Sequence, residues 1–185
     1  MAEQQIVIAG FGGQGVMSMG QLLTYAGMLE NKKVSWLPSY GPEMRGGTAN
    51  CNVIISDDPV GSPVVTDADT AIIMNLPSLD KFENYVVEDG YLLINNSLVD
   101  KKPFRKDVKV YEIPVNEIAD ELGNAKTANM VMLGAYIELT HVVNPESVLE
   151  SLKKVLGPSK EHLIPLNREA LKKGAKVIKE STQGI

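Results

Sequence analysis

The sequence predicts a single α/β domain in which helices cover both faces of a mainly parallel β-sheet. Short apolar runs alternate with helix-like segments along most of the chain. Residues 71–74 and 91–94 are apolar throughout, which is typical of strands buried on both faces of a parallel sheet. A glycine-rich turn follows the first apolar run, residues 6–9, and leads into a helical pattern. We therefore expect a three-layer α/β/α architecture with Rossmann-like topology, formed by residues 1–185 as one domain.

The strands are expected where apolar and β-branched residues gather, and the helices where apolar residues recur every three or four positions. No internal repeat or linker divides the series. The expected strands cover residues 6–9, 33–37, 48–56, 70–75, 91–95 and 108–113. The expected helices cover residues 14–30, 78–85, 116–122, 128–142, 145–156 and 168–180.

The boundaries of the last two helices carry their own signals. Asn144 can cap a helix and Pro145 suits its first turn, while Gly157 and Pro158 end it. Asn167 is expected to cap the final helix in the same way as Asn144 caps the one before it.

The charge balance argues against a nucleic-acid partner. The chain has 18 Lys and Arg residues against 23 Asp and Glu, a net charge of −5, whereas nucleic-acid affinity depends on neutralising phosphates. No uncharged apolar run reaches the length of a membrane span, and the N-terminus lacks the basic region of a secretory signal. We therefore expect a cytoplasmic chain that binds neither nucleic acid nor a membrane.

Cys51 is the only cysteine in the sequence. A single cysteine cannot ligate an iron–sulfur cluster or a structural zinc by itself, and we expect Cys51 to be a small buried thiol. A nucleophilic role would require a nearby base, and neither His141 nor His162 has a recognisable partner. We therefore expect no catalytic residue and no metal site in this chain, and any redox centre that it serves must belong to another chain.

Residues 10–15, with the sequence GFGGQG, form a GxGxxG pattern between the first strand and the first helix. A dinucleotide site also requires an acidic residue at the end of the second strand, but residues 34–39 read VSWLPS. A phosphate-binding P-loop requires Lys and Ser or Thr after its last glycine, where this chain has Val16 and Met17. The loop is then either a tight turn for close packing or a set of backbone N–H groups that bind another anion or a partner's backbone.

A second loop, residues 38–47 with the sequence PSYGPEMRGG, is rich in proline and glycine and therefore stiff. It would leave the carboxyl end of the second strand, at the same edge of a parallel sheet as the glycine loop. One interpretation is a surface loop in which Arg45 pairs with Glu43. We favour the other, a loop shaped to meet a ligand or another subunit, in which the Arg45 guanidinium binds a carboxylate or phosphate.

Together these motifs resemble one family. The segments GFGGQG (10–15), SYGPEMRGG (39–47), SD (56–57) and GSP (61–63), in this order, resemble the gamma subunit of 2-oxoacid oxidoreductases that use ferredoxin or another acceptor. The resemblance extends over nearly the whole chain, as a pyruvate/ketoisovalerate oxidoreductase gamma-type domain. Residues 74–79 (MNLPSL) and 95–99 (NNSLV) most resemble the 2-oxoglutarate type, with the 2-ketoisovalerate type close behind.

The resemblance implies a division of labour among subunits. In that family, thiamine diphosphate with Mg²⁺ lies between alpha and beta subunits, and iron–sulfur clusters lie in beta and in a ferredoxin-like delta subunit. The complex decarboxylates a 2-oxoacid, transfers the acyl group to coenzyme A and passes electrons to ferredoxin or a similar acceptor. We interpret this chain as a non-catalytic subunit of such a complex. The alternatives are a stand-alone NAD(P)- or flavin-binding Rossmann protein and a regulatory domain that binds a small anion.

The two loops are expected to form one contact with a ligand or with the partner subunits. Whether the glycine loop touches coenzyme A stays open, and Arg45 is the residue expected to contribute most. The expected contact residues are Gly12, Gly13, Gln14, Gly15, Tyr40, Gly41, Glu43, Arg45, Gly46 and Gly47.

Overall fold

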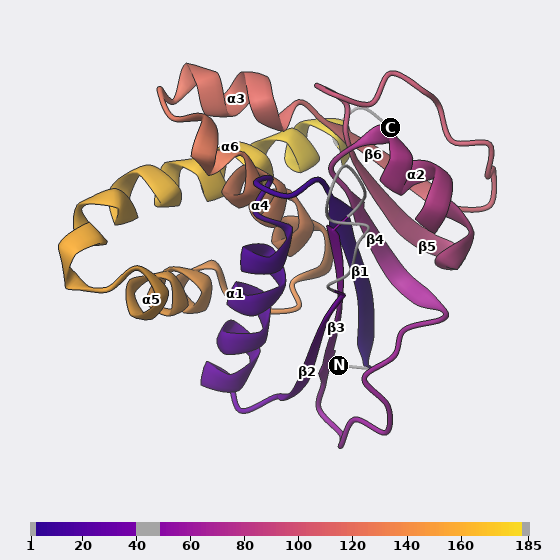
Figure 1. The fold of residues 1–185 in the computed structure, drawn as a ribbon, viewed down its shortest axis with the longest axis horizontal. Helices are drawn as coiled ribbons and strands as arrows, with labels where there is room; N and C mark the ends of the chain where they lie inside the picture. The colour runs from indigo at the N-terminus through magenta and orange to yellow at the C-terminus, as the bar shows by residue number, and fades with distance from the viewer. Residues whose placement is uncertain (1–2, 40–48, 183–185) are drawn as a thin grey trace.

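The computed structural model describes residues 3–39 and 49–182, which form a six-stranded sheet between two helical layers (Figure 1). The strand order in the sheet is β2-β3-β1-β4-β5-β6. The strands are β1 (Gln4–Gly10), β2 (Lys33–Ser39), β3 (Ala49–Ser56), β4 (Ala68–Ile73), β5 (Val86–Asn95) and β6 (Lys109–Ile113). The expected α/β domain is confirmed.

The sheet is mostly parallel, with one strand of opposite direction. Strands β1, β4, β5 and β6 pair in parallel, whereas β3 pairs antiparallel with both β1 and β2. Consecutive strands joined by a short connection pair antiparallel, because a parallel pairing needs a crossover of a dozen or more residues. As a result, β2 runs in the same direction as β1, but β3 lies between them.

The two helical layers are unequal. One face of the sheet is covered by α1 (Val16–Leu29), α4 (Ala128–Thr140), α5 (Pro145–Leu156) and α6 (Ile164–Thr182), with α3 (Val115–Glu121) beside them (Figure 1). The opposite face carries α2 (Leu76–Phe82). Three short 3-10 helices complete the secondary structure of the described residues: η2 (Glu83–Tyr85), η3 (Ala125–Thr127) and η4 (Pro158–Leu163).

Strand β1 shows why a central strand is apolar at consecutive positions in its middle. Ile6 and Ile8 belong to the larger core under α1 and α4, while Val7 and Ala9 belong to the smaller core under α2. All four side chains are fully buried, because alternate residues of a strand point to opposite faces of the sheet.

The helix boundaries lie within three residues of the predictions except at the start of the last helix. Helix α5 has the predicted bounds, and Asn144 Oδ1 accepts a hydrogen bond from the Glu146 N–H at 3.1 Å. The prediction that Asn167 caps the final helix is wrong, because α6 begins at Ile164 and contains Asn167. The preceding 3-10 helix runs directly into α6, and Asn167 Nδ2 instead donates to the Leu163 carbonyl at 2.9 Å.

Helices α4 and α6 touch through their backbones. A Cβ atom added at Gly134 would lie 2.0 Å from the Leu171 carbonyl oxygen, and one added at Gly174 would lie 1.8 Å from that of Val131. Only glycine permits such an approach, which fixes α6 across the middle of α4. None of the helices in the described part of the chain is both long and apolar enough to cross a membrane.

Candidate functional site

The candidate site lies at the edge of the sheet where β1, β4, β5 and β6 end, called here the carboxyl edge. Strand β2 ends at this edge and β3 begins there, because Gly10 pairs with Ala49 and Ser39 pairs with Asn50. The chain passes from β1 to α1 on one face and from β4 to α2 on the other. Open α/β sheets bind ligands at such a reversal, between the ends of the two diverging strands.

The glycine loop opens outward from this edge. Gly13 has φ 90° and Gly15 has φ 75°, a backbone conformation that side chains strongly disfavour. Space around Gly12 and Gly13 is open, with no atom within 4 Å of an added Cβ. Gly15 is instead crowded, since an added Cβ would lie 2.5 Å from Asn129 Nδ2 on α4. The loop thus packs against α4 at one end and exposes two glycines at its tip.

A hollow of about 320 Å³ lies beside the glycine loop. The first hydrogen bond inside α1 runs from the Met19 N–H to the Gly15 carbonyl at 2.9 Å, and Gly15 supplies no side chain to cap the helix. Among the described residues, the N–H groups of Val16, Met17 and Ser18 have no acceptor, so they are available to an anion or to a carbonyl of a partner. The hollow is lined by Phe11, Gly12, Gly13, Gly15, Val16, Met17, Ser18 and Ala49.

The Gln14 side chain fills the gap between β1 and the end of β4. Its Oε1 accepts a hydrogen bond from the Phe11 N–H at 2.6 Å, and its Nε2 donates to the Met74 carbonyl at 3.0 Å. Gly10 makes room for this side chain, because an added Cβ would lie 2.6 Å from Gln14 Oε1 and 2.8 Å from Met74 Cβ.

Buried asparagines at the ends of β4 and β5 complete the carboxyl edge, and the sequence reading did not single them out as site residues. Asn75 caps α2 by accepting a hydrogen bond from the Ser78 N–H at 2.9 Å. Asn95 donates to the Met74 carbonyl at 3.3 Å, beside the bond from Gln14. The available signal was an Asn directly after each of two apolar runs, since a buried amide must find hydrogen-bond partners.

Most of the second predicted loop, residues 38–47, lies outside the described residues. The predicted contact residues Tyr40, Gly41, Glu43, Arg45, Gly46 and Gly47 all lie outside the described residues. The described ends of β2 and β3, Ser39 and Ala49, lie at the carboxyl edge, and Ala49 lines the hollow beside the glycine loop. The end of β2 lies at the same edge of the sheet as the glycine loop, as predicted, but the two strands are not neighbours, because β3 separates β2 from β1.

The strand order also fails to meet a geometric requirement of dinucleotide binding. A ribose-binding carboxylate would have to stand at the end of the strand next to β1, but β2 lies two strand positions away, about 10 Å at the usual spacing. Its last residues, Trp36 to Ser39, include no acid. The edge therefore has the glycine turn of a nucleotide-binding fold without a carboxylate to accompany it on β2.

Cys51 is a buried thiol, as predicted. The side chain is fully buried on β3 beneath α1, and its Sγ lies 3.7 Å from the Val16 carbonyl oxygen. Burial raises the pKa of Cys51 from 9.0 to about 12, although the Trp36 indole and the Gly20 backbone act in the opposite direction. A protonated and inaccessible thiol is a poor nucleophile. Among the described residues, no three His, Cys, Asp or Glu side chains gather as a potential metal site.

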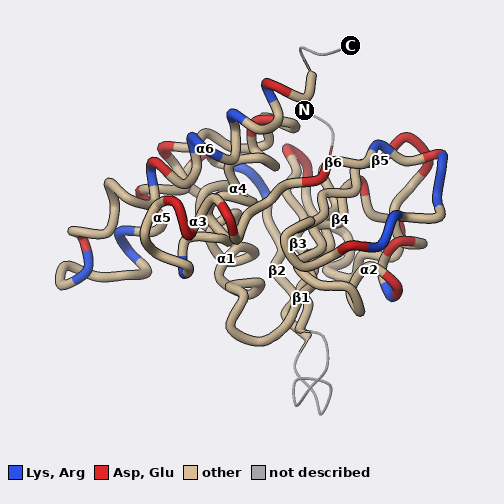
Figure 2. The backbone as a smooth tube through the Cα atoms, turned by 90° about the horizontal axis from the view of Figure 1, so that it is seen from above, with Lys and Arg blue, Asp and Glu red and all other residues tan. Residues whose placement is uncertain are grey.

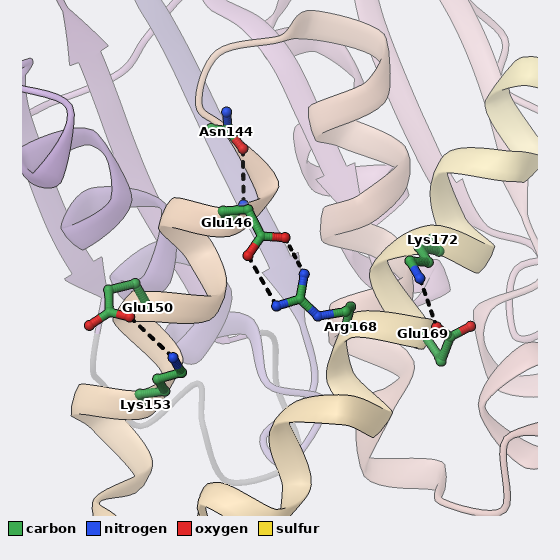
Figure 3. Close-up of polar contacts among 7 residues, drawn as sticks. All are labelled: Asn144, Glu146, Glu150, Lys153, Arg168, Glu169 and Lys172. Atoms are coloured by element: carbon green, nitrogen blue, oxygen red, sulfur yellow. Dashed lines mark hydrogen bonds and ion pairs between the residues drawn. The ribbon is translucent and has the colours of Figure 1, made fainter.

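A separate groove of about 430 Å³ between α4, α5 and α6 has paired charges (Figure 3). Arg168 on α6 forms a two-pronged ion pair with Glu146 on α5 and holds the pKa of that carboxyl below its usual value. Nearby, Lys172 pairs with Glu169 at 3.0 Å. Figure 2 shows acidic and basic residues interspersed along α5 and α6. We interpret this groove as a packing contact between helices, in which the Arg168–Glu146 ion pair stabilises α5 against α6.

Residues 5–177 match the family described as pyruvate ferredoxin/flavodoxin oxidoreductase. The chain belongs to this family. It is 40% identical over 183 residues to ketoisovalerate oxidoreductase subunit VorA of Methanothermobacter thermautotrophicus, which covers 98% of this chain but only 38% of that relative. It is 38% identical over 185 residues to 2-oxoglutarate synthase subunit KorC of Methanocaldococcus jannaschii, which covers 96% of this chain and 95% of that subunit.

Solved structures agree with the family assignment. The gamma subunit of keto/oxoacid ferredoxin oxidoreductase from Geobacter sulfurreducens has a TM-score of 0.82 and 29% identity, with 96% of this chain and 99% of that chain covered. A 2-oxoglutarate:ferredoxin oxidoreductase from Magnetococcus marinus shares the fold, with a TM-score of 0.87 and 24% identity over 97% of this chain and 32% of that chain. Within the family, this chain thus corresponds to the gamma subunit, as the sequence motifs predicted.

Proposed function

We propose that this chain is the gamma subunit of a cytoplasmic oxidoreductase that converts a 2-oxoacid and coenzyme A into an acyl-coenzyme A thioester and CO₂. The two electrons released would pass to ferredoxin or a similar acceptor. The observation that carries this proposal is the nearly end-to-end match to KorC, of which the chain covers 95%. The chain spans 38% of the length of VorA, so in that relative the equivalent segment belongs to a longer chain.

The catalytic groups are proposed to lie on other subunits. The sequence contains one cysteine, which is buried with a raised pKa, and iron–sulfur clusters are held by several cysteine ligands. Thiamine diphosphate with Mg²⁺, and the clusters, are therefore assigned to alpha, beta and ferredoxin-like delta partners. This chain would act by binding those partners and supporting their assembly.

We propose 2-oxoglutarate as the substrate of the complex. Residues 74–79, which carry the resemblance to the 2-oxoglutarate type together with residues 95–99, follow β4 and lead into α2, and residues 95–99 begin at the last residue of β5. Both segments lie at the carboxyl edge. The second candidate is 2-ketoisovalerate, because the identity to VorA, at 40%, is slightly above the 38% to KorC.

Purification of the complex tests both proposals. A tagged copy of the chain, expressed in its own cells, should co-purify with thiamine- and cluster-binding subunits that mass spectrometry identifies. The complex should reduce an acceptor dye only when a 2-oxoacid and coenzyme A are both present, with the highest kcat/KM for 2-oxoglutarate. The isolated chain should be colourless and inactive. Recovery of the chain without such partners would contradict the assignment, and a higher kcat/KM for 2-ketoisovalerate would correct the substrate.

The proposed contact with the catalytic subunits is formed by the glycine loop and residues 40–47, beside the path of coenzyme A. Three observations support it: Gly12 and Gly13 are open, the first N–H groups of α1 border the same hollow, and Ala49 lines it. The Magnetococcus marinus enzyme, which shares the fold, was solved with 2-oxoglutarate, coenzyme A and succinyl-coenzyme A bound.

Two matched glycines make this contact testable. Gly12 and Gly61 both have open space around them and φ values outside the left-handed region, but Gly61 follows β3, at the opposite edge of the sheet. Gly12→Trp should therefore block association with the catalytic subunits while the isolated chain stays folded, and Gly61→Trp should leave association unchanged. Equal association of both variants, measured by surface plasmon resonance, would show that the glycine loop is not a contact.

A further inference from the structure

We propose that Gln14 is a positioning residue that holds the glycine loop in the conformation required for assembly. This inference rests on the proposed function, because it assumes that the loop contacts the catalytic subunits. The two hydrogen bonds of Gln14, from the Phe11 N–H to Oε1 and from Nε2 to the Met74 carbonyl, are called the Gln14 bridge.

The Gln14 bridge uses both ends of one amide to join the loop to a different strand. The bond to Phe11, at 2.6 Å, closes the loop on itself, while the bond to Met74, at 3.0 Å, joins it to a residue 60 positions further along the chain. Gly10 is crowded by both Gln14 and Met74, and the half-buried Gln14 side chain lies against Gly10 at the junction of β1 and β4. Its geometry is therefore set by the sheet.

The bridge continues into a network across the carboxyl edge. The Met74 carbonyl also accepts from Asn95 Nδ2 at 3.3 Å, and the same Nδ2 donates to Asn116 Oδ1 at 2.8 Å. Asn95 Oδ1 accepts from the Ser97 N–H at 3.2 Å. Asn95 is fully buried, which makes its hydrogen bonds costly to break. The glycine loop is thus attached to a rigid set of strand ends.

This attachment matters because the loop itself is rich in glycine. Gly12 and Gly13 have no atoms near an added Cβ, so no side chain of the loop tip restrains them. Glycine loses more conformational freedom than other residues when it is ordered. A loop that is already ordered before binding avoids that entropic cost during assembly. Removal of the Gln14 bridge should therefore weaken association more than it weakens folding.

Two substitutions remove one or both hydrogen bonds of the Gln14 bridge. Gln14→Glu keeps an oxygen to accept from Phe11 but replaces the donor to Met74 by an oxygen that repels its carbonyl. Gln14→Met keeps the length of the side chain and removes both hydrogen bonds. The matched control is Gln21, a half-buried residue on α1 with no hydrogen bond of its side chain to the rest of the described chain; it receives the same two substitutions.

The experiment measures the affinity of each variant for the catalytic subunits, the kinetics of the reconstituted complex and amide exchange in the isolated chain. Both Gln14 variants should associate about tenfold more weakly, which corresponds to the cost of ordering about one loop residue, with kcat unchanged at saturating subunit concentration. The Phe11 amide should exchange faster than in the wild type in Gln14→Met, which loses the acceptor, but at nearly the wild-type rate in Gln14→Glu, which keeps it. The Gln21 variants should match the wild type in every measurement.

Each other outcome overturns the proposal in a recognisable way. If Gly12→Trp blocks assembly but the Gln14 variants assemble normally, the loop is a contact and Gln14 does not position it. If neither substitution changes assembly, the proposed contact itself fails. If the Gln14 variants lose stability and kcat together, their role is only structural. A wild-type Phe11 amide that exchanges as fast as those of Gly12 and Gly13 would refute the bridge without any variant.

Discussion

Replacing Gly174 by Ala should destabilise the isolated chain, although alanine favours helices. In an unconstrained helix this substitution stabilises by about 1 kcal/mol. At Gly174, however, the added Cβ would lie 1.8 Å from the Val131 carbonyl oxygen and 2.9 Å from the Ala135 nitrogen. Both atoms are backbone atoms of α4, which cannot turn aside as a side chain can. Helices α4 and α6 would have to separate until the shorter distance reached at least 3.4 Å, where ordinary contact begins.

The expected net loss in the free energy of unfolding is about 2 kcal/mol, an overpacking cost of about 3 kcal/mol less the gain in helix propensity of about 1 kcal/mol. Overpacking of a core costs about 1–3 kcal/mol and occasionally more, and a clash between two backbones belongs at the upper end of that range. Separation of α4 from α6 would also loosen the contacts of Leu133 and Leu171, which belong to the larger core. These costs outweigh the gain in helix propensity, so the sign of the effect is opposite to that expected from propensity alone.

Urea unfolding followed by circular dichroism measures this difference, with Gly27→Ala as the control. At Gly27 the nearest atom to an added Cβ is Val34 Cγ1, at 2.7 Å, which is the tip of a half-buried side chain. That variant should lose about 1 kcal/mol or less, because Val34 can move. A Gly174→Ala chain as stable as the wild type would refute the reasoning and show that the two backbones are further apart than the structure indicates.

Three further predictions concern Cys51, the glycine loop and Arg45. The pKa of Cys51 is raised to about 12 in the folded chain, so on raising the pH the thiol ionises first in the unfolded chain. The free energy of unfolding should therefore fall by about 1.4 kcal/mol per pH unit above pH 9.0. The same pH dependence of this free energy in the wild type and in Cys51→Ala would contradict this. Calorimetric titration of the isolated chain with NADH, NADPH or FAD should show no saturable heat at millimolar ligand, because Gln14 fills the gap between β1 and β4; tight binding would revive the dinucleotide alternative. Arg45 lies outside the described residues. Arg45→Ala should leave the isolated chain folded but weaken the free energy of assembly by about 2–5 kcal/mol if its charge pair is buried, or raise the KM for coenzyme A by the corresponding factor. Arg45→Lys should not restore the loss, and a variant complex with wild-type affinity and turnover would show that Arg45 is a surface residue.

The sequence predicts the strands where burial is visible in composition, but it misses residues 86–90 of β5, which include the exposed Glu88 and Asp89. Residues 71–73 of β4 are apolar at consecutive positions because they are buried on both faces of the sheet. The order and direction of the strands are not encoded locally, and the insertion of β3 between β1 and β2 could not be derived from an apolar pattern. The predicted start of α6, residue 168, was too late, because η4 (Pro158–Leu163) continues into the helix without a capping signal.

For the candidate site, the sequence identifies the glycine loop but not what holds it. The GxGxxG spacing is local, but of its three glycines only Gly15 has a left-handed φ, and the other left-handed residue of the loop, Gly13, stands at a variable position of the pattern. The bond from Gln14 to Met74 joins residues 60 positions apart, and the bond from Asn95 to the same carbonyl spans 21. Such contacts depend on which strands become neighbours in the sheet, so they appear only when the fold is known.

Two features of the carboxyl edge separate this domain from a dinucleotide-binding one, and both act at the same place. Strand β3 occupies the position next to β1, which moves the end of β2 away from the glycine loop. Gln14 occupies the gap between β1 and β4, where the fold would otherwise leave a crevice. Neither change disturbs the exposed tip at Gly12 and Gly13. A loop that keeps its open glycines while a side chain occupies its crevice is better suited to contact a surface than to enclose a nucleotide, which agrees with the proposed contact with partner subunits.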